Sequence, residues 1–278
     1  IIPPSIVFVI YGSTNGVSIS KLLMSGMLPG ILTAVVLCLY GYVVAKKENF
    51  PKSFDQFSLK RVLKSLKGAV WALMMPLIIL GGIYGGIFTP TESAMIACAY
   101  GLVVSFFVTK ELTVKNFFDV VSKTAASTAN VTVMFLAAQV FGFLIAYYDI
   151  TTTIANFFVA VSPNWIIFMG LVFILLTITG MFMEVGATNV ILSPLLAPVA
   201  AAFGIDPIHF GMVFVFLLAL GQATPPFGST MFIACGISGE RVAAVIRRLL
   251  PFVLVEYACA LVFAYVPWFS TFLPSLMA

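Results

Sequence analysis

Charge is scarce in this sequence. Of its 278 residues only 9% are charged, whereas 62% are hydrophobic and the mean hydropathy is +1.14. A soluble domain carries about a quarter charged residues, so this chain has too few to cover a globular surface in water. The deficit excludes an ordinary cytosolic enzyme, a nucleic-acid-binding protein and a disordered chain. Apolar stretches of about 20 residues recur instead, which is typical of an all-α polytopic protein of the lipid bilayer.

Histidine and cysteine are also scarce. His209 is the only histidine, so neither a histidine-based metal site nor a Ser-His-Asp triad is available within the chain. The four cysteines are single residues in apolar segments and form no CxxC pair, which indicates buried thiols. With no nucleophile–base pair visible either, we expect neither an enzyme nor an organic cofactor.

Lysine and arginine are absent from Thr124 to Glu240. Elsewhere they gather in three clusters, 46–67, 110–123 and 241–248, which hold every basic residue except Lys21. The positive-inside rule places these three clusters in the cytoplasm and the C-terminus on the opposite side. The expected upright spans are 27–45, 69–84, 93–108, 124–148 and 249–269, with an amphipathic connector at 110–123.

Region 149–240 must cross the membrane an odd number of times, yet its apolar segments are short. Residues 165–183 and 190–203 flank the sequence EVGATN, and the second arm, of about 14 residues, is too short for an upright span. We expect a re-entrant hairpin with residues 186–189 at its tip. Residues 208–220 and 227–237 flank GQATPP and predict one helix that is broken in the middle.

Two proline pairs indicate an internal repeat. The interval from Pro4 to Pro29 equals the interval from Pro226 to Pro251, and each copy runs from a half-helix through an amphipathic stretch to a long span. Charge placement gives the two long spans opposite directions, so the repeat is inverted, as in many secondary transporters. The first copy lacks the hairpin that precedes the second proline pair, so we expect further residues upstream of Ile1.

A broken helix at membrane depth must line a cavity or be buried in protein. Unpaired carbonyls at 218–221 would suit a dehydrated cation such as Na⁺, and free N–H groups at 224–228 would suit a carboxylate. We expect Thr224 to cap the second half, with prolines in its first turn and glycines that allow close approach. The candidate residues of the break are Gly221, Gln222, Ala223, Thr224, Pro225, Pro226 and Gly228.

The hairpin tip offers similar chemistry. Gly186 can take a left-handed turn, and Thr188 or Asn189 can cap the second arm and present its oxygen to an ion. Hard cations prefer oxygen ligands, and a neutral cage can hold a monovalent ion. The alternative interpretation is that these residues only cap short helices.

Acidic residues form a weaker set of candidates. Glu184, beside the hairpin tip, and Glu256, inside the last span, are candidate coupling acids, because an intramembrane carboxylate is a functional candidate by default. Each can equally be a structural acid. Glu92 is expected to cap a helix or face solvent, and His209 to be a solvated residue at a helix start.

Several motifs resemble the large membrane subunit of TRAP (tripartite ATP-independent periplasmic) transporters. They are IIPPSI, GGIYGGIFTPTESA, GATNVILSPLLAPVAAAFGIDPIHFG and TPPFGSTMF, and the similarity extends over essentially the whole chain. The family subunit is longer, so the chain looks like its C-terminal two-thirds. The resemblance implies Na⁺-coupled import of an organic anion, such as a sialic acid or a C4-dicarboxylate, by an elevator mechanism in the bacterial inner membrane. It also implies two partners, a small four-helix membrane subunit and a periplasmic substrate-binding protein.

The resemblance also assigns sites and domains. Residues 1–26 and 149–240 match the transport domain, 27–148 the scaffold, and 241–278 a connector with the final helix, whose C-terminus is periplasmic. The implied Na⁺-binding residues are Gly186, Ala187, Thr188, Asn189, Gly221, Gln222, Ala223, Thr224 and Ser5. The implied substrate-binding residues are Thr224, Pro225, Pro226, Gly228, Asn189, Pro3 and Pro4. The hairpin that would face Pro3, Pro4 and Ser5 in the family's first ion site is absent from this chain.

Two other functions fit the same residues. One is a related inverted-repeat symporter that is coupled to Na⁺ or protons and works without a binding protein. The other is an ion channel or a membrane scaffold without coupling, which would show no saturable uptake.

Overall fold

The computed structural model describes residues 1–50, 58–225, 228–239 and 241–276, and every regular element in these ranges is helical. This confirms the all-α class. The helices form two compact units, Ile1–Tyr40 with Asn130–Ala278, and Gly41–Ala129. The boundaries between the units fall inside two helices, α3 (Met27–Lys47) and α6 (Val114–Tyr147).

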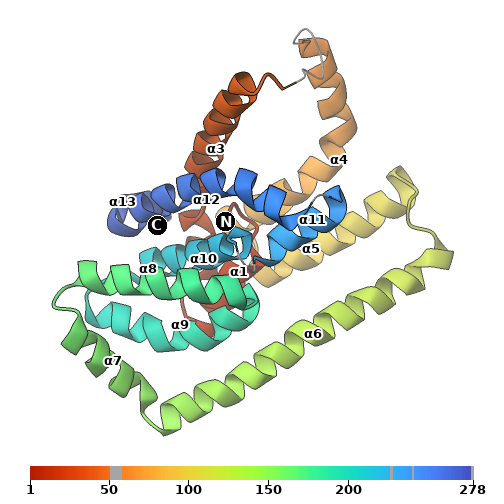
Figure 1. Ribbon diagram of the computed structural model, residues 1–278. Coiled ribbons are helices and arrows are strands. Elements are labelled where there is room, and N and C mark those ends of the chain that lie inside the picture. Colours follow the sequence, from red (N-terminus) through yellow and green to blue (C-terminus); the bar gives the residue numbers. More distant parts are fainter. Residues whose placement is uncertain (51–57, 226–227, 240, 277–278) are drawn as a thin grey trace. The chain divides into compact units, whose positions relative to one another are not determined.

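The first unit contains the hairpin and the broken helix (Figure 1). Besides parts of α3 and α6, its helices are α1 (Ile6–Asn15), α2 (Ile19–Ser25), α7 (Ile150–Val161), α8 (Trp165–Phe182), α9 (Val185–Ala202), α10 (Pro207–Ala223), α11 (Ser229–Ser238), α12 (Val242–Tyr265) and α13 (Trp268–Ser275). The helix α7 had not been predicted from the sequence, and it packs against α9.

Helix α10 is the centre of this unit. Most of its residues are buried, 12 of 17, and it packs against α1, α2, α8, α9, α12 and α13. A helix that is apolar all round is expected to be buried on all sides. Its first turn is fixed by Asp206, whose Oδ1 accepts hydrogen bonds from the N–H groups of Ile208 (2.8 Å) and His209 (3.0 Å).

Helices α8 and α9 form the predicted hairpin, closed at its base by aromatic rings. Phe168, in the first turn of α8, stacks on Phe203, which follows α9, with ring centroids 4.8 Å apart. The Phe168 ring also lies 6.3 Å from the ring of Phe210 in the first turn of α10. At the other end of the same two helices, Gly180 of α8 touches Gly221 of α10. Helices α8 and α10 therefore run side by side in the same direction (Figure 1).

The second arm of the hairpin is longer than expected. Helix α9 has 18 residues, equal to α8, so each arm is about 27 Å long. Residues 186–189 lie in the first turns of α9 and do not form a tip loop. The expectation of a short arm that starts at Val190 was wrong because Glu184 caps the helix and lets it begin at Val185.

The last span also differs in its bounds. The predicted segment 249–269 is divided between α12, which begins at Val242, and α13, which is bent by 62° from it at Val266–Pro267. Within the described ranges, five helices are long and apolar enough to cross a membrane, and this bent pair would make a sixth. The chain is a multi-pass membrane protein.

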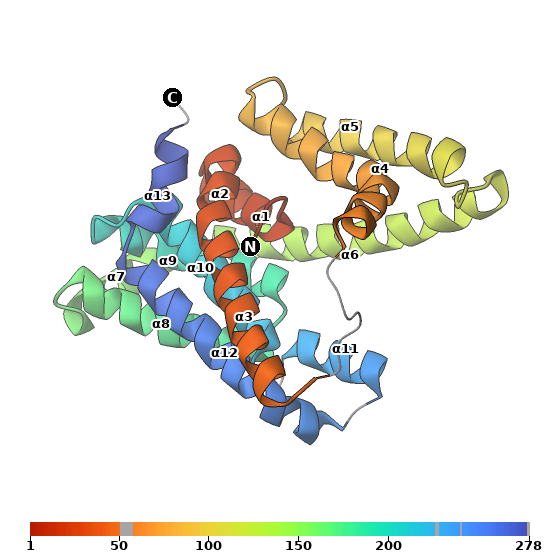
Figure 2. The same ribbon diagram turned by 90° about the horizontal axis from the view of Figure 1, so that it is seen from above.

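The repeat is visible in the helices that follow the two proline pairs. Both α1 and α11 have ten residues, and both end at a left-handed glycine, Gly16 (φ 66°) and Gly239 (φ 70°). The two copies of the repeat then differ. In the first copy Gly26 separates α2 from α3, whereas in the second copy the corresponding helix α12 is continuous. A Cβ atom on Gly26 would lie 2.6 Å from the ring of Phe8, so the separation allows α1 to pack closely there. Figure 2 shows α3 against α12, where the rings of Tyr40 and Phe252 lie 4.8 Å apart.

The second unit contains α4 (Leu59–Tyr84), α5 (Pro90–Val103) and the π-helical turn η1 (Val104–Val108), with α4 packed against α5. Glu92 caps α5, as expected. Its Oε2 accepts a hydrogen bond from the Thr89 N–H (2.8 Å), and Thr89 Oγ1 accepts one from the Glu92 N–H (3.3 Å). This reciprocal pair is a capping box, which is a sufficient structural role for Glu92.

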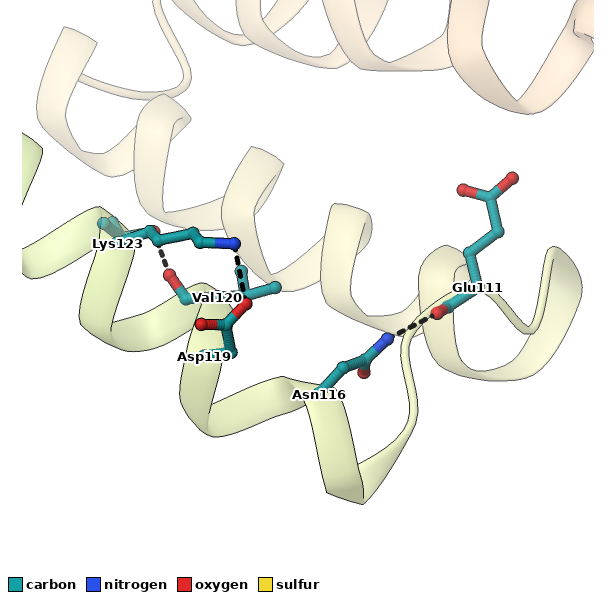
Figure 3. A network of polar contacts seen from close by, with 6 residues as sticks. Glu111, Asn116, Asp119, Val120 and Lys123 are labelled. Atoms are coloured by element: carbon teal, nitrogen blue, oxygen red, sulfur yellow. Dashed lines mark hydrogen bonds and ion pairs between the residues drawn. The ribbon is translucent and has the colours of Figure 1, made fainter.

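The segment 110–123 is not a separate connector, because α6 begins at Val114 and includes most of it. Figure 3 shows the contacts at this end of α6: Asn116 Nδ2 donates to the Glu111 carbonyl (3.0 Å), and Lys123 pairs with Asp119 one turn away (2.7 Å). Such local contacts favour helix through a charged stretch. The predicted span 124–148 is therefore the C-terminal part of a 34-residue helix.

Candidate ion and substrate site

The hairpin meets the broken helix at Gly180 and Gly221. A Cβ atom on Gly221 would lie 2.6 Å from the Gly180 Cα, and one on Gly180 would lie 3.1 Å from the Gly221 Cα. Only glycine permits this backbone approach. We call this region the junction: it comprises the last turn of α8, the first two turns of α9, and the last turn of α10 with Thr224.

Helix ends give the junction its electrostatic character. Helices α8 and α10 both end there, at Phe182 and Ala223, and the last carbonyls of a helix carry partial negative charge. The sequence has no lysine or arginine from Thr124 to Glu240 to offset that charge. The start of α9 also lies in the junction and carries partial positive charge, so helix ends of both signs meet there.

Glu184 is the cap of α9. Its Oε2 accepts a hydrogen bond from the Ala187 N–H (2.9 Å), and its carbonyl accepts one from Thr188 Oγ1 (2.9 Å). The expectation that Thr188 or Asn189 caps this arm was wrong, as was the left-handed turn at Gly186, which is helical. Glu184, which lies directly before α9, caps the helix, so the chain needs no sharp turn at Gly186.

Asn189 is fully buried, and the two ends of its amide have different surroundings. Nδ2 donates to the Val7 carbonyl of α1 (2.9 Å), whereas Oδ1 has no hydrogen-bond donor among the described residues. A carbonyl only accepts, so Nδ2 must face Val7 and Oδ1 must point the other way. Leaving a buried acceptor unpaired costs about 1–3 kcal/mol, so Oδ1 is suited to a ligand.

Thr224 ends α10 and does not begin the second half of the broken helix. Its Oγ1 donates to the Leu220 carbonyl (2.7 Å) and lies 3.0 Å from the Tyr257 hydroxyl of α12. Since the single hydroxyl hydrogen of Thr224 points to Leu220, Tyr257 must be the donor in the second contact. The cap was misassigned because this threonine bonds back to the preceding turn.

The backbone of the break is more fully bonded than expected. The Thr224 N–H donates to the Gly221 carbonyl (3.0 Å), and the Gly228 N–H donates to the Thr224 carbonyl (3.1 Å). With Leu220 also engaged, the predicted free carbonyls at 218–221 and free N–H groups at 224–228 were wrong for these atoms. A Cβ atom on Gly228 would lie 2.4 Å from the Gln222 carbonyl oxygen, so this compact turn needs glycine.

The first turn of α11 has no side-chain cap. This helix begins at Ser229, and its N-cap Gly228 has no side chain to accept a hydrogen bond. The first N–H groups of a helix have no intrahelical partner. The predicted placement of two prolines in the first turn was wrong for Pro225, which lies in the turn before α11, and Pro226 lies outside the described residues.

Helix α1 has a similar start. Its N-cap Ser5 makes no side-chain capping bond, so its first N–H groups are available in the same way. The Asn189–Val7 hydrogen bond brings this turn against the start of α9. This contact between the first copy of the repeat and the hairpin of the second copy had not been predicted.

The candidate acids differ in their surroundings. Glu184 is exposed and acts as a cap, whereas Glu256 is half-buried in α12 and has no hydrogen-bond or ion-pair partner among the described residues. His209 was wrongly expected to be solvated. It is buried, its Nε2 lies 3.1 Å from the Ala264 carbonyl, and its Nδ1 lies 2.7 Å from Ser270 Oγ.

One residue of the junction, Gly180, and one that contacts the junction, Tyr257 of α12, were missed. Gly180 is an isolated glycine in an apolar helix, a pattern that indicates close backbone approach and was open to detection. Tyr257 carried no signal, because only the fold brings α12 against Thr224.

The chain was compared with known proteins. The family model described as the tripartite ATP-independent periplasmic transporter, DctM component, matches residues 1–269. The chain is 40% identical over 266 residues to an isethionate TRAP transporter permease protein of Oleidesulfovibrio alaskensis, covering 96% of this chain and 42% of that protein.

Two further relatives are each 34% identical to the chain and cover all of it. They are a sialic acid TRAP transporter permease protein of Haemophilus influenzae, matched over 45% of its length, and a C4-dicarboxylate TRAP transporter large permease protein of Vibrio cholerae, matched over 65%. The chain thus spans only part of these proteins. These relatives are permeases and not enzymes. The chain belongs to the family of the DctM component of tripartite ATP-independent periplasmic transporters.

Proposed function

We propose that this chain forms part of a Na⁺-coupled importer of an organic anion, and that Na⁺ binds at the junction. The observation that supports this most is the fully buried Asn189 Oδ1, which has no donor among the described residues. Asn189 lies in the second turn of α9, and the ends of α8 and α10 meet at Gly180 and Gly221. A neutral oxygen beside helix C-termini suits a monovalent cation.

The other oxygens at the junction fit the same ion. Thr224 Oγ1 gives its hydrogen to Leu220 and accepts one from Tyr257, which leaves acceptor capacity for a cation. Thr188 Oγ1 is also a donor to backbone and keeps its lone pairs. No basic side chain of the segment 124–240 competes for these oxygens.

The substrate is proposed to be a small organic acid in its ionised form. The starts of α1 and α11 both lack side-chain caps, and free N–H groups at a helix start bind anions. The relatives named above are called transporters of isethionate, sialic acid and C4-dicarboxylate, which are all anions at neutral pH. Pro3, Pro4, Pro225, Pro226 and Gly228 are the residues beside these two helix starts.

In the proposed cycle, Na⁺ orders the start of α9 against Gly221–Thr224 and so completes the anion site. The transport domain then moves as an elevator within the bacterial inner membrane, with clusters 46–67, 110–123 and 241–248 in the cytoplasm. A small permease subunit would extend the scaffold, and a periplasmic binding protein would deliver the acid. The name "large permease protein" of one relative supports such a two-part permease.

The test is uptake into proteoliposomes. Full-length permease, its small subunit and its binding protein would be supplied with radiolabelled isethionate, sialic acid or succinate. Uptake of one acid that requires an inward Na⁺ gradient and the binding protein supports the proposal. Uptake that follows a proton gradient and ignores Na⁺ would overturn it, favour the proton-coupled alternative, and move attention to Glu256.

A further inference from the structure

Two hydrogen bonds clamp α1 to α9. Asn189 Nδ2 donates to the Val7 carbonyl (2.9 Å), and Asn15 Nδ2 donates to Ser193 Oγ (2.8 Å). Val7 is in the first turn of α1, and Asn15 is its last residue. Because α1 follows the first proline pair and α9 belongs to the hairpin before the second, the clamp joins the two copies of the repeat.

The Asn189 amide can transmit an effect between its two ends. The group is planar, and its terminal torsion is otherwise broad, so a ligand that fixes Oδ1 also fixes the direction of Nδ2. A cation on Oδ1 also polarises the amide and makes Nδ2 a stronger donor. Asn189 is fully buried, so bulk solvent does not reach either atom.

The start of α1 is able to respond. Ser5 makes no side-chain capping bond, so the first turn is held mainly by backbone hydrogen bonds and by contacts such as the one from Asn189 to Val7. The Val9 N–H donates to the Ser5 carbonyl at 3.3 Å, a long hydrogen bond. An uncapped helix start with a long first hydrogen bond frays easily unless it is held from outside.

We propose that Asn189 couples cation binding at the junction to the ordering of the first turn of α1, 182 residues away in sequence. The inference rests on the proposed function, because the cation is the Na⁺ of that proposal. Coupling is reciprocal, so an anion that orders this turn raises the affinity of the junction for Na⁺ by the same factor. Asn189 is thus a positioning residue for the α1 turn as well as an ion ligand.

Hydrogen exchange measured by mass spectrometry tests the coupling in the full-length permease. NaCl would be compared with choline chloride at equal ionic strength, without substrate, for peptides covering Glu184–Val190 and Ser5–Tyr11. We expect Na⁺ to slow exchange in both peptides, by about fivefold or more in the second. Slowing in the hairpin peptide alone would overturn the inference and leave the proposed function standing. Slowing in neither would contradict the Na⁺ site itself.

A variant pair isolates the atom responsible. Asn189→Asp replaces the donor that faces Val7 with an oxygen, so the Na⁺ effect should vanish from the α1 peptide. Asn15→Ala removes the other hydrogen bond between the same helices and should leave both Na⁺ effects in place. An unchanged α1 response in Asn189→Asp would contradict the role of Nδ2. The wild-type comparison decides the coupling even if this variant folds poorly.

Discussion

Gly180 and Gly221 touch through their backbones, and this contact fixes the end of α8 against the end of α10. A Cβ atom on Gly221 would lie 2.6 Å from the Gly180 Cα. The rings of Phe168 and Phe210 pair at the other end of the same two helices, with centroids 6.3 Å apart. Helices α8 and α10 are therefore parallel, and their C-termini lie next to each other.

The glycine contact is expected to tolerate no side chain. Gly221→Ala should lower the free energy of unfolding by about 1–3 kcal/mol, because backbone atoms of Gly180 cannot move aside as a flexible side chain would. The measurement is the thermal midpoint of the purified permease in detergent. Gly236→Ala in α11, where a Cβ would meet nothing within 4 Å, is the matched control. An equal loss in both variants would contradict the packing argument.

Glu184 is expected to act as a helix cap and not as a proton carrier. Glu184→Asn replaces it with a strong capping residue and should preserve Na⁺-dependent uptake. Glu184→Ala should lower stability by about 1 kcal/mol, because the Ala187 N–H loses its acceptor. Loss of uptake in Glu184→Asn, with normal stability, would show that the carboxyl group itself is needed.

Thr224 and Tyr257 allow a test that separates a structural contact from ion binding. Thr224→Val removes the hydroxyl and should raise the Na⁺ concentration that gives half-maximal uptake. Tyr257→Phe removes only the donor to that hydroxyl, so it should have a smaller effect. Equal effects of the two substitutions would indicate that Thr224 only holds α12.

His209 is expected to be a structural residue that holds α12 and α13 to the start of α10. Ser270→Ala leaves His209 Nδ1 without its 2.7 Å partner and should cost about 1–3 kcal/mol in the free energy of unfolding. Thr271→Ala, at a half-buried position of the same helix, should cost less, because its hydroxyl bonds only to a local carbonyl. Thermal midpoints of both variants provide the check.

Sequence patterns predicted the helical class, the hairpin, the break and the repeat, because hydropathy, basic clusters and paired prolines all act locally. They failed in two situations. In one, two neighbouring residues could each make the same hydrogen bond. In the other, the partner comes from a distant segment that only the fold brings close. Glu184 directly precedes α9 and Thr188 lies in its first turn, and the sequence pattern did not show which of the two caps the helix. The contacts of Asn189 with Val7 and of Thr224 with Tyr257 join distant segments, so no spacing rule indicates them.

The most direct test of the account is the Na⁺ concentration for half-maximal uptake in wild type, Asn189→Leu and Asn15→Leu. The acid used is the one that the reconstituted wild type accumulates. If Asn189 Oδ1 binds Na⁺, Asn189→Leu raises this concentration by about tenfold or more, which corresponds to a loss of about 1.4 kcal/mol. Asn15→Leu, which removes the second α1–α9 hydrogen bond and a local bond to the Tyr11 carbonyl, leaves it unchanged. An unaltered Na⁺ dependence in Asn189→Leu would contradict the ion site at the junction.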